Sequence, residues 1–482
     1  MAQLVDFLNG IIWSPALVYL CLGVGLYFSL RTRFLQVRHI KAMVKLLFGG
    51  QASDQGITSF QAFALAVAGR VGTGNIAGVA TAIAMGGPGA VFWMWAIAFL
   101  GAGSAYVESV LAQVYKVEVD GEYRGGPAYF IERGLGIKWY AILFAVATVI
   151  GMGFFLPGVQ SNSIAVSMEN AFGLSPVITG IIVCGLLALI IFGGVKRIGK
   201  AAEMIVPFMA IAYIIVALIV IVVNITKLPA VISLIFSSAF GVNQAFGGIL
   251  GTAIAWGVKR GIYSNEAGQG TGPMAAAAAE VSHPAKQGLV QAFSVYFDTL
   301  FVCSATAFMI LITGTYNVQG PDGGFIVENL PGVDIGPAYT QGAMDTLLPG
   351  FGAAFVAIAL FFFAFTTLMA YYYYAETSIA YLFKKGPTRH TVINVLRVLL
   401  LVSIFYGTVR TASLAWGLGD IGVGLMAWLN IIAIVIMQKT AFLTLTDYEE
   451  QIAQGKDPVF DPVKLGIKNA DIWTKINKTA KN

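Results

Sequence analysis

The sequence predicts an all-α, polytopic membrane protein with about eleven transmembrane helices. Of its 482 residues, 57% are hydrophobic and only 11% are charged, with a mean hydropathy of +0.79. Soluble domains typically carry about 25% charged residues. Apolar runs of about 20 residues, each long enough to span the hydrocarbon layer as a helix, recur from end to end. Two of these runs are interrupted by clusters of glycine.

The apolar runs define eleven expected spans. Their approximate limits are 12–30, 58–85, 89–115, 138–172, 175–194, 203–224, 244–272, 287–314, 349–381, 391–409 and 417–438. The spans 138–172 and 349–381 are unusually long, which predicts helices that are tilted or project beyond the bilayer. The first run lacks a preceding basic region, so we expect a retained span and not a cleaved signal.

The chain offers room for one membrane domain and no second folded domain. We expect residues 1–445 to form a single transmembrane domain and residues 446–482 a polar cytoplasmic tail. The three cysteines all lie in apolar segments and are expected to be small packing residues. Their spacing predicts neither a disulfide framework nor a metal site.

The distribution of Lys and Arg predicts the orientation of the chain. Most of the 29 basic residues follow spans 1, 3, 5 and 9 or lie in the tail, and Lys259, Arg260 and Lys286 are assigned near the end of span 7. The 315–348 segment contains no Lys or Arg. Because basic residues gather in cytoplasmic segments, the N-terminus is expected outside and the C-terminus inside. The positive charge therefore indicates the orientation of the chain in the membrane and not a nucleic-acid-binding surface.

The two glycine-interrupted spans predict an inverted repeat. The first reads FQAFALAVAGRVGTGNIAGVATAIAM over residues 60–85, and the second reads FGGILGTAIAWGVKRGIYSNEAGQGTG over residues 246–272. An unwound backbone in lipid is tolerated only where its polar groups face protein, water or a ligand. The second span lies five spans later and runs in the opposite direction. We expect residues 58–224 and 244–438 to be the repeats, with span 1 extra and the breaks meeting near the midplane. Alternatively, glycine here allows close helix packing.

Four segments resemble the alanine/glycine:cation symporter family. They are GGPGAVFWMW (86–95), RVGTGNIAGVA (70–80), FGGVKRIGK (192–200) and RGIYSNEAGQGT (260–271), and the resemblance extends over about residues 10–445. It implies a LeuT-like 5+5 inverted-repeat fold in a bacterial or archaeal inner membrane. It also implies sodium-coupled uptake of small neutral amino acids, alanine or glycine among them.

A zwitterionic amino acid needs two complementary surfaces. Its carboxylate suits bare backbone N–H groups at a half-helix N-terminus, which Gly72, Thr73, Gly74 and Asn75 could present. Its ammonium group needs oxygen acceptors, and unwound carbonyls around Ala255, Trp256 and Gly257 are the candidates in span 7. Packing or lipid contact is the alternative for Trp256.

Span 4 carries amides within a long apolar run. The LeuT-like arrangement places this helix beside the substrate, so Gln160 and Asn162 are candidate substrate ligands and Phe155 a candidate size gate. Buried amides also serve as interhelical hydrogen bonds, and this alternative stays open.

The resemblance also implies a sodium site made from hydroxyl and carbonyl oxygens. In LeuT-like sodium transporters, two adjacent hydroxyls of one helix meet carbonyls of the first broken helix. Here these would be Thr366 and Thr367 with the carbonyls of Ala68 and Val71. Hydroxyls in an apolar helix are often bonded to their own backbone instead. The tyrosines at 371–374 are expected to be an interface belt or packing, rather than ligands.

Charged residues inside the spans are functional candidates. Asp298 is the best-placed acid and could bind a second cation or pair with Arg70. Glu108 is the other possible partner of Arg70, and Glu266 could act in an inner gate.

The segment 194–201 nearly matches a phosphate-binding loop but lacks the Ser or Thr that holds Mg²⁺. No nucleophile with a base or metal indicates an enzyme. No cofactor is expected beyond sodium, and the expected partners are a small amino acid and lipid, not nucleic acid. No feature defines an oligomeric state. A proton-coupled LeuT-like carrier or one for another substrate, or with less support an ion channel, remains the alternative.

Overall fold

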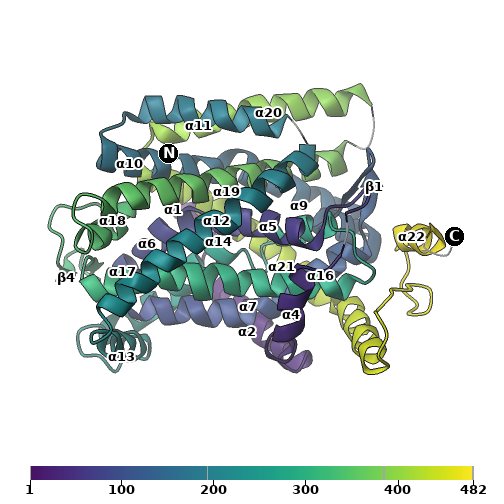
Figure 1. The fold of residues 1–482 in the computed structure, drawn as a ribbon, viewed down its shortest axis with the longest axis horizontal. Helices are drawn as coiled ribbons and strands as arrows, with labels where there is room; N and C mark the ends of the chain where they lie inside the picture. The colour runs from purple at the N-terminus through teal and green to yellow at the C-terminus, as the bar shows by residue number, and fades with distance from the viewer. Residues whose placement is uncertain (1, 51, 193, 384–385, 480–482) are drawn as a thin grey trace.

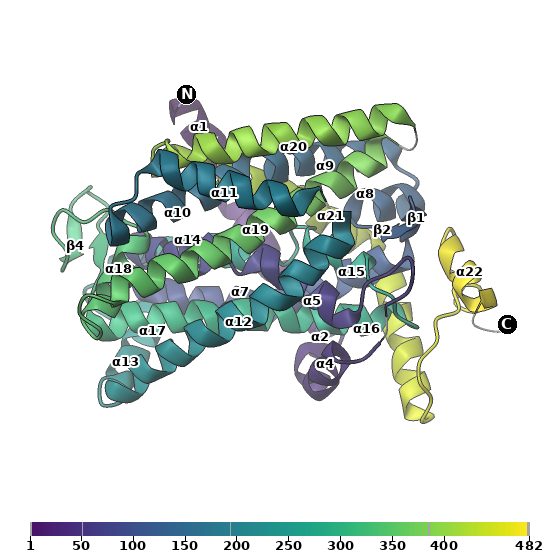
Figure 2. The ribbon, with the colours of Figure 1, turned by 45° about the horizontal axis from the view of Figure 1, so that its top comes forward.

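The computed structural model describes residues 2–50, 52–192, 194–383 and 386–479. Long helices lie side by side along the longest axis of the molecule (Figures 1 and 2). The described strands form two antiparallel hairpins, β1 (Val117–Val119) with β2 (Glu122–Arg124), and β3 (Asn317–Gln319) with β4 (Phe325–Glu328). Val117 pairs with Arg124 in the first hairpin, and Asn317 pairs with Glu328 in the second. The chain is therefore helical, as its composition predicts.

A helix or a set of successive helices lies in each of the eleven expected ranges. In chain order the α-helices are α1 (Ala2–Ile12), α2 (Pro15–Arg31), α3 (Leu35–Arg38), α4 (Ile40–Leu47), α5 (Ser59–Arg70), α6 (Val79–Gly86), α7 (Gly89–Val114), α8 (Pro127–Phe130), α9 (Lys138–Ile150), α10 (Leu156–Phe172), α11 (Pro176–Ile191), α12 (Gly194–Val223), α13 (Leu228–Ala239), α14 (Leu250–Asn265), α15 (Gly272–Ala277), α16 (Pro284–Tyr296), α17 (Ser304–Thr313), α18 (Pro337–Asp345), α19 (Gly352–Leu382), α20 (Pro387–Thr408), α21 (Ala412–Ala453) and α22 (Asp471–Thr479). Wider or tighter turns are η1 (Gly74–Gly78), η2 (Ile131–Leu135), η3 (Gly151–Phe155), η4 (Gly247–Ile249) and η5 (Phe297–Cys303).

Seven helical segments among the described residues are long and apolar enough to cross a membrane, or nine if two bent pairs each count as one span. The bent pairs are α1 with α2, at 40°, and α5 with the Gly74–Gly86 segment, at 51°. The helices α11 and α13 are apolar but shorter. These segments make the chain a multi-pass membrane protein.

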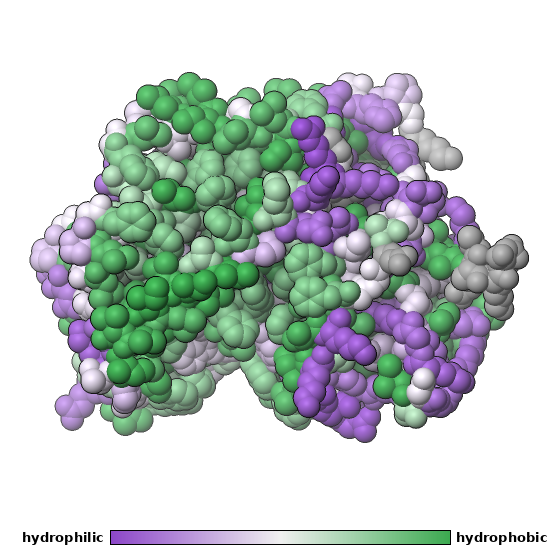
Figure 3. Space-filling view, viewed as in Figure 1, coloured by the Kyte–Doolittle hydropathy of each residue, from purple (hydrophilic) through white to green (hydrophobic). Residues whose placement is uncertain are grey.

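The surface separates into an apolar middle and two polar ends. Figure 3 shows a broad hydrophobic area over the centre and left of the molecule and hydrophilic side chains gathered at the right. We call the right-hand end, with β1, β2 and α22, the tail end, and the left-hand end, with β3, β4 and α18, the loop end (Figure 1). The apolar middle is the surface that a bilayer would cover.

The two termini lie toward opposite ends of the bundle. Asn9 of α1 donates a hydrogen bond to the carbonyl of Gly417 near the start of α21. At the tail end, the Trp473 indole of α22 donates to the carbonyl of Gln113 at the end of α7. Among the described residues, the first helix thus lies beside the first turns of α21 and the last helix beside the last turn of α7.

The C-terminal segment is packed on the protein. The α21 helix continues to Ala453, well past the expected limit of 438. The following loop bonds back to the α15–α16 turn, with the Phe460 N–H donating to Ser282 O and the Ser282 hydroxyl donating to Pro458 O. Trp473 is fully buried. The buried Phe460 ring packs on it, and these apolar surfaces explain why a segment rich in polar residues docks.

Candidate functional site

The first break lies where the sequence predicts it. The α5 helix ends at Arg70, and Val71 follows in an extended conformation before the helix resumes. At Gly72, a Cβ would lie 2.9 Å from the Gln160 Oε1 atom and would also clash with the Thr367 hydroxyl. Only glycine fits this approach, because any side chain would displace both neighbours. The break is therefore enclosed by α10 and α19.

Side-chain amides hold the N–H groups that this break exposes. The Gly72 N–H donates to Asn75 Oδ1 at 2.8 Å, and the Thr73 N–H donates to Gln160 Oε1 at 3.0 Å. The expectation of bare N–H groups is therefore wrong for this conformation. A buried N–H without a partner is costly, and the two amides supply the acceptors that these groups need. The structure does bring Gly72, Thr73, Asn75 and Gln160 together.

The expected cation ligands converge only in part. The Thr367 hydroxyl of α19 lies 2.9 Å from Ala68 O and 3.4 Å from Val71 O, at the end of α5. Both hydroxyls also lie 2.9 Å from Phe363 O of their own helix, but the Thr366 hydroxyl lies 3.8 Å from Met209 Sδ and not at the carbonyls of the break. Adjacent residues on a helix point in directions about 100° apart. The geometry thus directs Thr367 to the break and Thr366 away from it.

The second break lies about ten residues later than expected. Ala255, Trp256 and Gly257 are inside the continuous helix α14, so the prediction of unwound carbonyls there is wrong. The helix ends at Asn265, the next residue, Glu266, has a left-handed φ of 54°, and the chain becomes helical again as α15 at Gly272. Gly257 instead lets α14 approach α7, because its Cβ would lie 2.5 Å from Ala90 O. At this position, the alternative of close packing holds.

The two breaks meet through a hydrogen-bonded network around Asp298. A Cβ at Gly74 would lie 3.1 Å from the Cα of Ser264, so η1 and α14 are in close contact. Asp298 Oδ1 accepts from Asn75 Nδ2 at 2.7 Å and from Ser264 Oγ at 3.1 Å, and Oδ2 accepts from Thr299 Oγ1 at 2.7 Å. Both carboxylate oxygens are therefore satisfied by neutral donors.

Arg70 bonds to neutral groups and, among the described residues, forms no ion pair with Asp298 or Glu108. Its Nε donates to Asn265 O at 2.6 Å, and its Nη1 donates to Gln291 Oε1 and to Ser294 Oγ. Glu108 accepts instead from the Gly268 N–H at 3.2 Å and from Asn430 Nδ2 at 2.6 Å. The hypothesis of a direct pair with either acid is not supported by this geometry.

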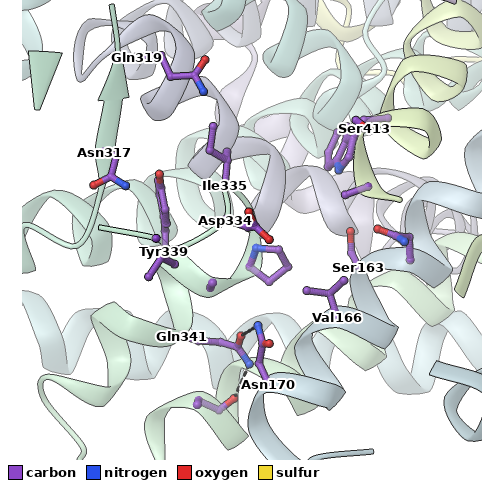
Figure 4. Close-up of a pocket in the computed structure, with 18 of the residues that line it drawn as sticks. Ser163, Val166, Asn170, Asn317, Gln319, Asp334, Ile335, Tyr339, Gln341 and Ser413 are labelled. Atoms are coloured by element: carbon purple, nitrogen blue, oxygen red, sulfur yellow. Dashed lines mark hydrogen bonds between the residues drawn. The ribbon is translucent and has the colours of Figure 1, made fainter. Parts of the chain in front are cut away.

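A cavity of about 880 Å³ opens at the loop end. Figure 4 shows Ser163 and Val166 of α10 facing the segment that carries Asp334, Ile335 and Tyr339. Asn162 lines this cavity and donates to the carbonyls of Gly407 and Arg410, at 3.1 and 2.7 Å. Asn162 thus holds the end of α20, while Gln160, two residues earlier, faces the first break.

Trp416 forms the inner wall of this cavity. It lines the cavity and lies 3.7 Å from the Cβ position of Gly78 in η1. The Arg260 guanidinium stacks on its ring, 4.6 Å from the centroid. Arg260 and Lys259 both bind Asp420 Oδ2, at 2.6 and 2.7 Å. These cations therefore lie on the loop-end side of the second break, and their assignment to the opposite end of span 7 is wrong.

Phe155 lies at the last residue of the wide turn η3 and is half-buried. Its Cβ lies 3.8 Å from the Cβ position of Gly422 in α21. Trp256 is half-buried and stacks on the cations of Lys259 and Arg260, at 4.9 and 5.2 Å. The tyrosines at 371–374 are buried, which excludes an interface belt and favours packing.

Two buried bases lie at the tail end, outside the spans. Burial lowers the pKa of the Lys116 ammonium to about 7, and this group lies 5.0 Å from the Trp473 ring centroid. Burial also lowers the pKa of His283 to about 4, against the opposing effect of its hydrogen bond to Asp447. Both bases are in contact with the docked C-terminal segment or with α21.

The described residues contain no group of three or more His, Cys, Asp or Glu side chains able to hold a metal ion. The oxygen atoms of Thr367, Gln160, Ala68 and Val71 at the first break belong to neutral hydroxyl, amide and carbonyl groups. Such groups suit a hard monovalent cation and a zwitterion better than a transition metal.

The family model described as the sodium:alanine symporter family matches residues 1–462. The chain belongs to this family. A putative sodium/proton-dependent alanine carrier protein of Bacillus subtilis is 66% identical over 98% of both chains. A sodium/proton-dependent alanine carrier protein of Bacillus sp. strain PS3 is 55% identical over 89% of this chain and 97% of that protein.

A more distant relative in the family comes from an archaeon. The sodium/alanine symporter of Methanococcus maripaludis is 39% identical over 90% of this chain and 94% of that protein. A solved manganese transporter of Eremococcus coleocola covers 86% of this chain and 90% of its own, with 12% identity and a TM-score of 0.49. That likeness is too weak to carry an argument.

Proposed function

We propose that this chain is a secondary active symporter that imports small neutral amino acids, alanine or glycine among them, with sodium. The observation that carries the proposal is the approach of the Thr367 hydroxyl to the carbonyls of Ala68 and Val71. Three uncharged oxygens at a helix break offer a hard cation its preferred ligands without a titrating group. The family and the names of the relatives agree with this chemistry.

The amino acid would bind beside the first break. Its carboxylate would replace the Asn75 and Gln160 side chains at the N–H groups of Gly72 and Thr73, where the helix dipole favours an anion. The Tyr263 hydroxyl is buried near Gln160 and makes no hydrogen bond of normal length among the described residues, and it is a candidate acceptor for the ammonium group. Phe155 remains the proposed limit on side-chain size, from the side of α21.

The proposed fold is a LeuT-like pair of inverted repeats, residues 58–224 and 244–438, within one transmembrane domain of residues 1–445. Support comes from the breaks in the first helix of each expected repeat and from their contact at Gly74 and Ser264. The proposal includes all eleven spans and alternating access about the two breaks.

We propose further that the loop end is extracellular and the tail end cytoplasmic. Basic residues remain concentrated in the segments that join the spans at the tail end after Lys259 and Arg260 are reassigned. The docked residues 456–479 would then be cytoplasmic, in a bacterial inner membrane.

Uptake into proteoliposomes tests this function. Labelled alanine or glycine should accumulate when an inward Na⁺ gradient is imposed, and uptake should saturate with substrate. Equal accumulation under a pH gradient in sodium-free buffer would instead support a proton-coupled carrier. Flux that does not saturate would support a channel.

A further inference from the structure

Glu266 is a buried acid without a hydrogen-bond partner among the described residues. It lies at the second break and is fully buried, and neither carboxylate oxygen accepts a hydrogen bond of normal length from the described residues; the Thr271 hydroxyl is the neighbouring donor. This contrasts with Asp298, whose two oxygens accept from three donors, and with Glu108, which accepts from two. A buried carboxylate with no donor is costly unless a ligand or a proton neutralises it.

Other buried polar atoms without hydrogen-bond partners lie beside Glu266 or in the break that follows it. The hydroxyls of Tyr374 and Thr271 and the side-chain amide of Gln269 are buried and make no hydrogen bond within the described ranges. Glu266 Oε2 and the Tyr374 hydroxyl both face Gly69, at 3.2 and 2.7 Å from its Cβ position. Because a Cβ at Gly69 would meet both oxygens, the absence of a side chain there lets both groups approach the end of α5. These oxygens are the type that Na⁺ and other hard cations bind.

The charge balance around the breaks also favours a cation. Glu266 lies within electrostatic range of Arg70, Asp298 and Glu108. The other titratable groups that face it are the phenols Tyr263, Tyr371 and Tyr374. The buried region around the two breaks thus holds one guanidinium and three carboxylates. The Nη2 atom of Arg70 points to Gly272 and has no hydrogen-bond partner in the described part of the chain.

We propose that Glu266, with Tyr374, Thr271 and Gln269, forms a second sodium site beside the one at Thr367. Thr367 and Tyr374 are seven residues apart on α19, so the two sites lie about 10 Å apart along one helix face. Each contacts the end of α5, at Ala68 and at Gly69 respectively. The inference rests on sodium symport as the function and extends it to the number of ions bound.

Equilibrium binding of ²²Na⁺ to the purified full-length chain, without amino acid, tests this site. Glu266→Gln should bind one fewer sodium ion per molecule than the unchanged chain, whereas the surface variant Glu328→Gln should bind the same number. Thr367→Ala should also lose one ion and keep the ion at Glu266. Tyr374→Phe, with exposed Tyr27→Phe as its control, should raise the Na⁺ concentration needed to fill the second site about tenfold. The Tyr374→Phe variant keeps the proposal testable if Glu266→Gln does not fold.

Three results would overturn the second site. One is a sodium count that Glu266→Gln and Tyr374→Phe leave unchanged. Another is a loss of alanine binding in Glu266→Gln with its sodium count intact, which would assign the carboxylate to the ammonium group. The last is alanine-linked proton uptake in sodium-free buffer that Glu266→Gln removes, again with the sodium count intact. If instead neither the unchanged chain nor any of the variants bound sodium, the proposed function itself would be wrong.

Discussion

At the scale of single residues, two neighbouring threonines have different surroundings. Both hydroxyls bond to Phe363 O, but the Thr367 hydroxyl also faces the first break, whereas the Thr366 hydroxyl faces Met209. Sequence alone predicts that hydroxyls lie here, but not which one faces the carbonyls, because that depends on the rotation of α19 about its axis. A substitution at Thr366 therefore serves as the control for the same substitution at Thr367.

Thr367→Val should raise the Na⁺ concentration required for half-maximal uptake, because the isosteric side chain removes one oxygen ligand. A lost polar partner at a buried site costs about 1–3 kcal/mol, which corresponds to about 5- to 150-fold. Thr366→Val should change the same concentration by less than about threefold. Uptake measured against external Na⁺ gives both values, and equal effects would contradict the assignment.

Asp298→Asn should lower stability while leaving the sodium requirement close to normal. An asparagine would replace one carboxylate oxygen by an NH₂ group, which would face either the Thr299 donor at Oδ2 or the Asn75 and Ser264 donors at Oδ1. The expected loss is about 1–3 kcal/mol, seen as a lower melting temperature in detergent. Asp322→Asn, in the exposed loop, is the neutral control. A changed sodium dependence with unchanged stability would make Asp298 a cation ligand.

At the scale of elements, glycine has two separate uses in α14 and the segment after it. Gly268 and Gly270 have left-handed φ angles of 80° and 93° within the break. Gly257 and Gly261 instead let the intact helix approach α7. The sequence predicts that this span is interrupted, but glycine spacing cannot separate these uses. The break begins at Glu266, a residue type that rarely adopts a left-handed φ, so no pattern marks it.

Two glycines of α14 test close packing. In Gly257→Ala the new Cβ would lie 2.5 Å from both Ala90 O and Trp93 Cβ. We expect a loss of about 1–3 kcal/mol from overpacking. Gly251→Ala meets nothing within 4 Å and should be neutral or stabilising by up to about 1 kcal/mol. Melting temperatures of the two variants measure the difference, and equal values would argue against tight contact.

The N-terminal cap of α16 should make stability depend on pH. The ordinary pKa of a histidine side chain is 6.5, and burial lowers the pKa of His283 to about 4 in the folded chain. Between these values the unfolded chain holds the extra proton, so the contribution of His283 to stability is complete above pH 6.5 and falls as the pH drops toward 4. His283→Asn keeps a capping acceptor but does not titrate, and should weaken this dependence.

Melting temperatures measured from about pH 7 to about pH 4.5, the range in which the two states differ in bound protons, test the role of His283. The exposed His390 provides the control, and His390→Asn should leave the pH dependence as it is. If both variants kept the same slope as the unchanged chain, then another group would be responsible for the loss at low pH.

At the scale of the whole molecule, the sequence predicts most of the helices but less of the structure at the tail end and the loop end. Apolar runs determine where the spans lie because apolar side chains are stable in the hydrocarbon core of the bilayer. The docking of residues 456–479 was not predictable from overall polarity, since a few buried apolar side chains, chiefly Phe460 and Trp473, hold a segment rich in polar residues. The reassigned Lys259 and Arg260 show the same limit, because a single acid, Asp420, and stacked aromatic rings retain them inside the protein.

Trp473→Ala should loosen the C-terminal segment without unfolding the membrane domain. The indole is fully buried and bonded to Gln113, so its loss exposes the segment to protease. Trp139→Ala, at a tryptophan that is 70% exposed, should not change the cleavage rate. Limited proteolysis followed by mass spectrometry gives the cleavage sites, and equal rates in the two variants would contradict a docking role for Trp473.

The docked segment has a kinetic consequence for a carrier that alternates between faces. It joins the end of α7 to the α15–α16 turn, so it ties together the two proposed repeats on one side. Opening that side would require the docked segment to detach or to move together with both repeats. Such a restraint changes how fast the carrier cycles, yet it cannot change the final accumulation ratio, which the ion gradient alone determines. Release of Trp473 should therefore speed amino-acid exchange across the membrane and leave the plateau of uptake where it was.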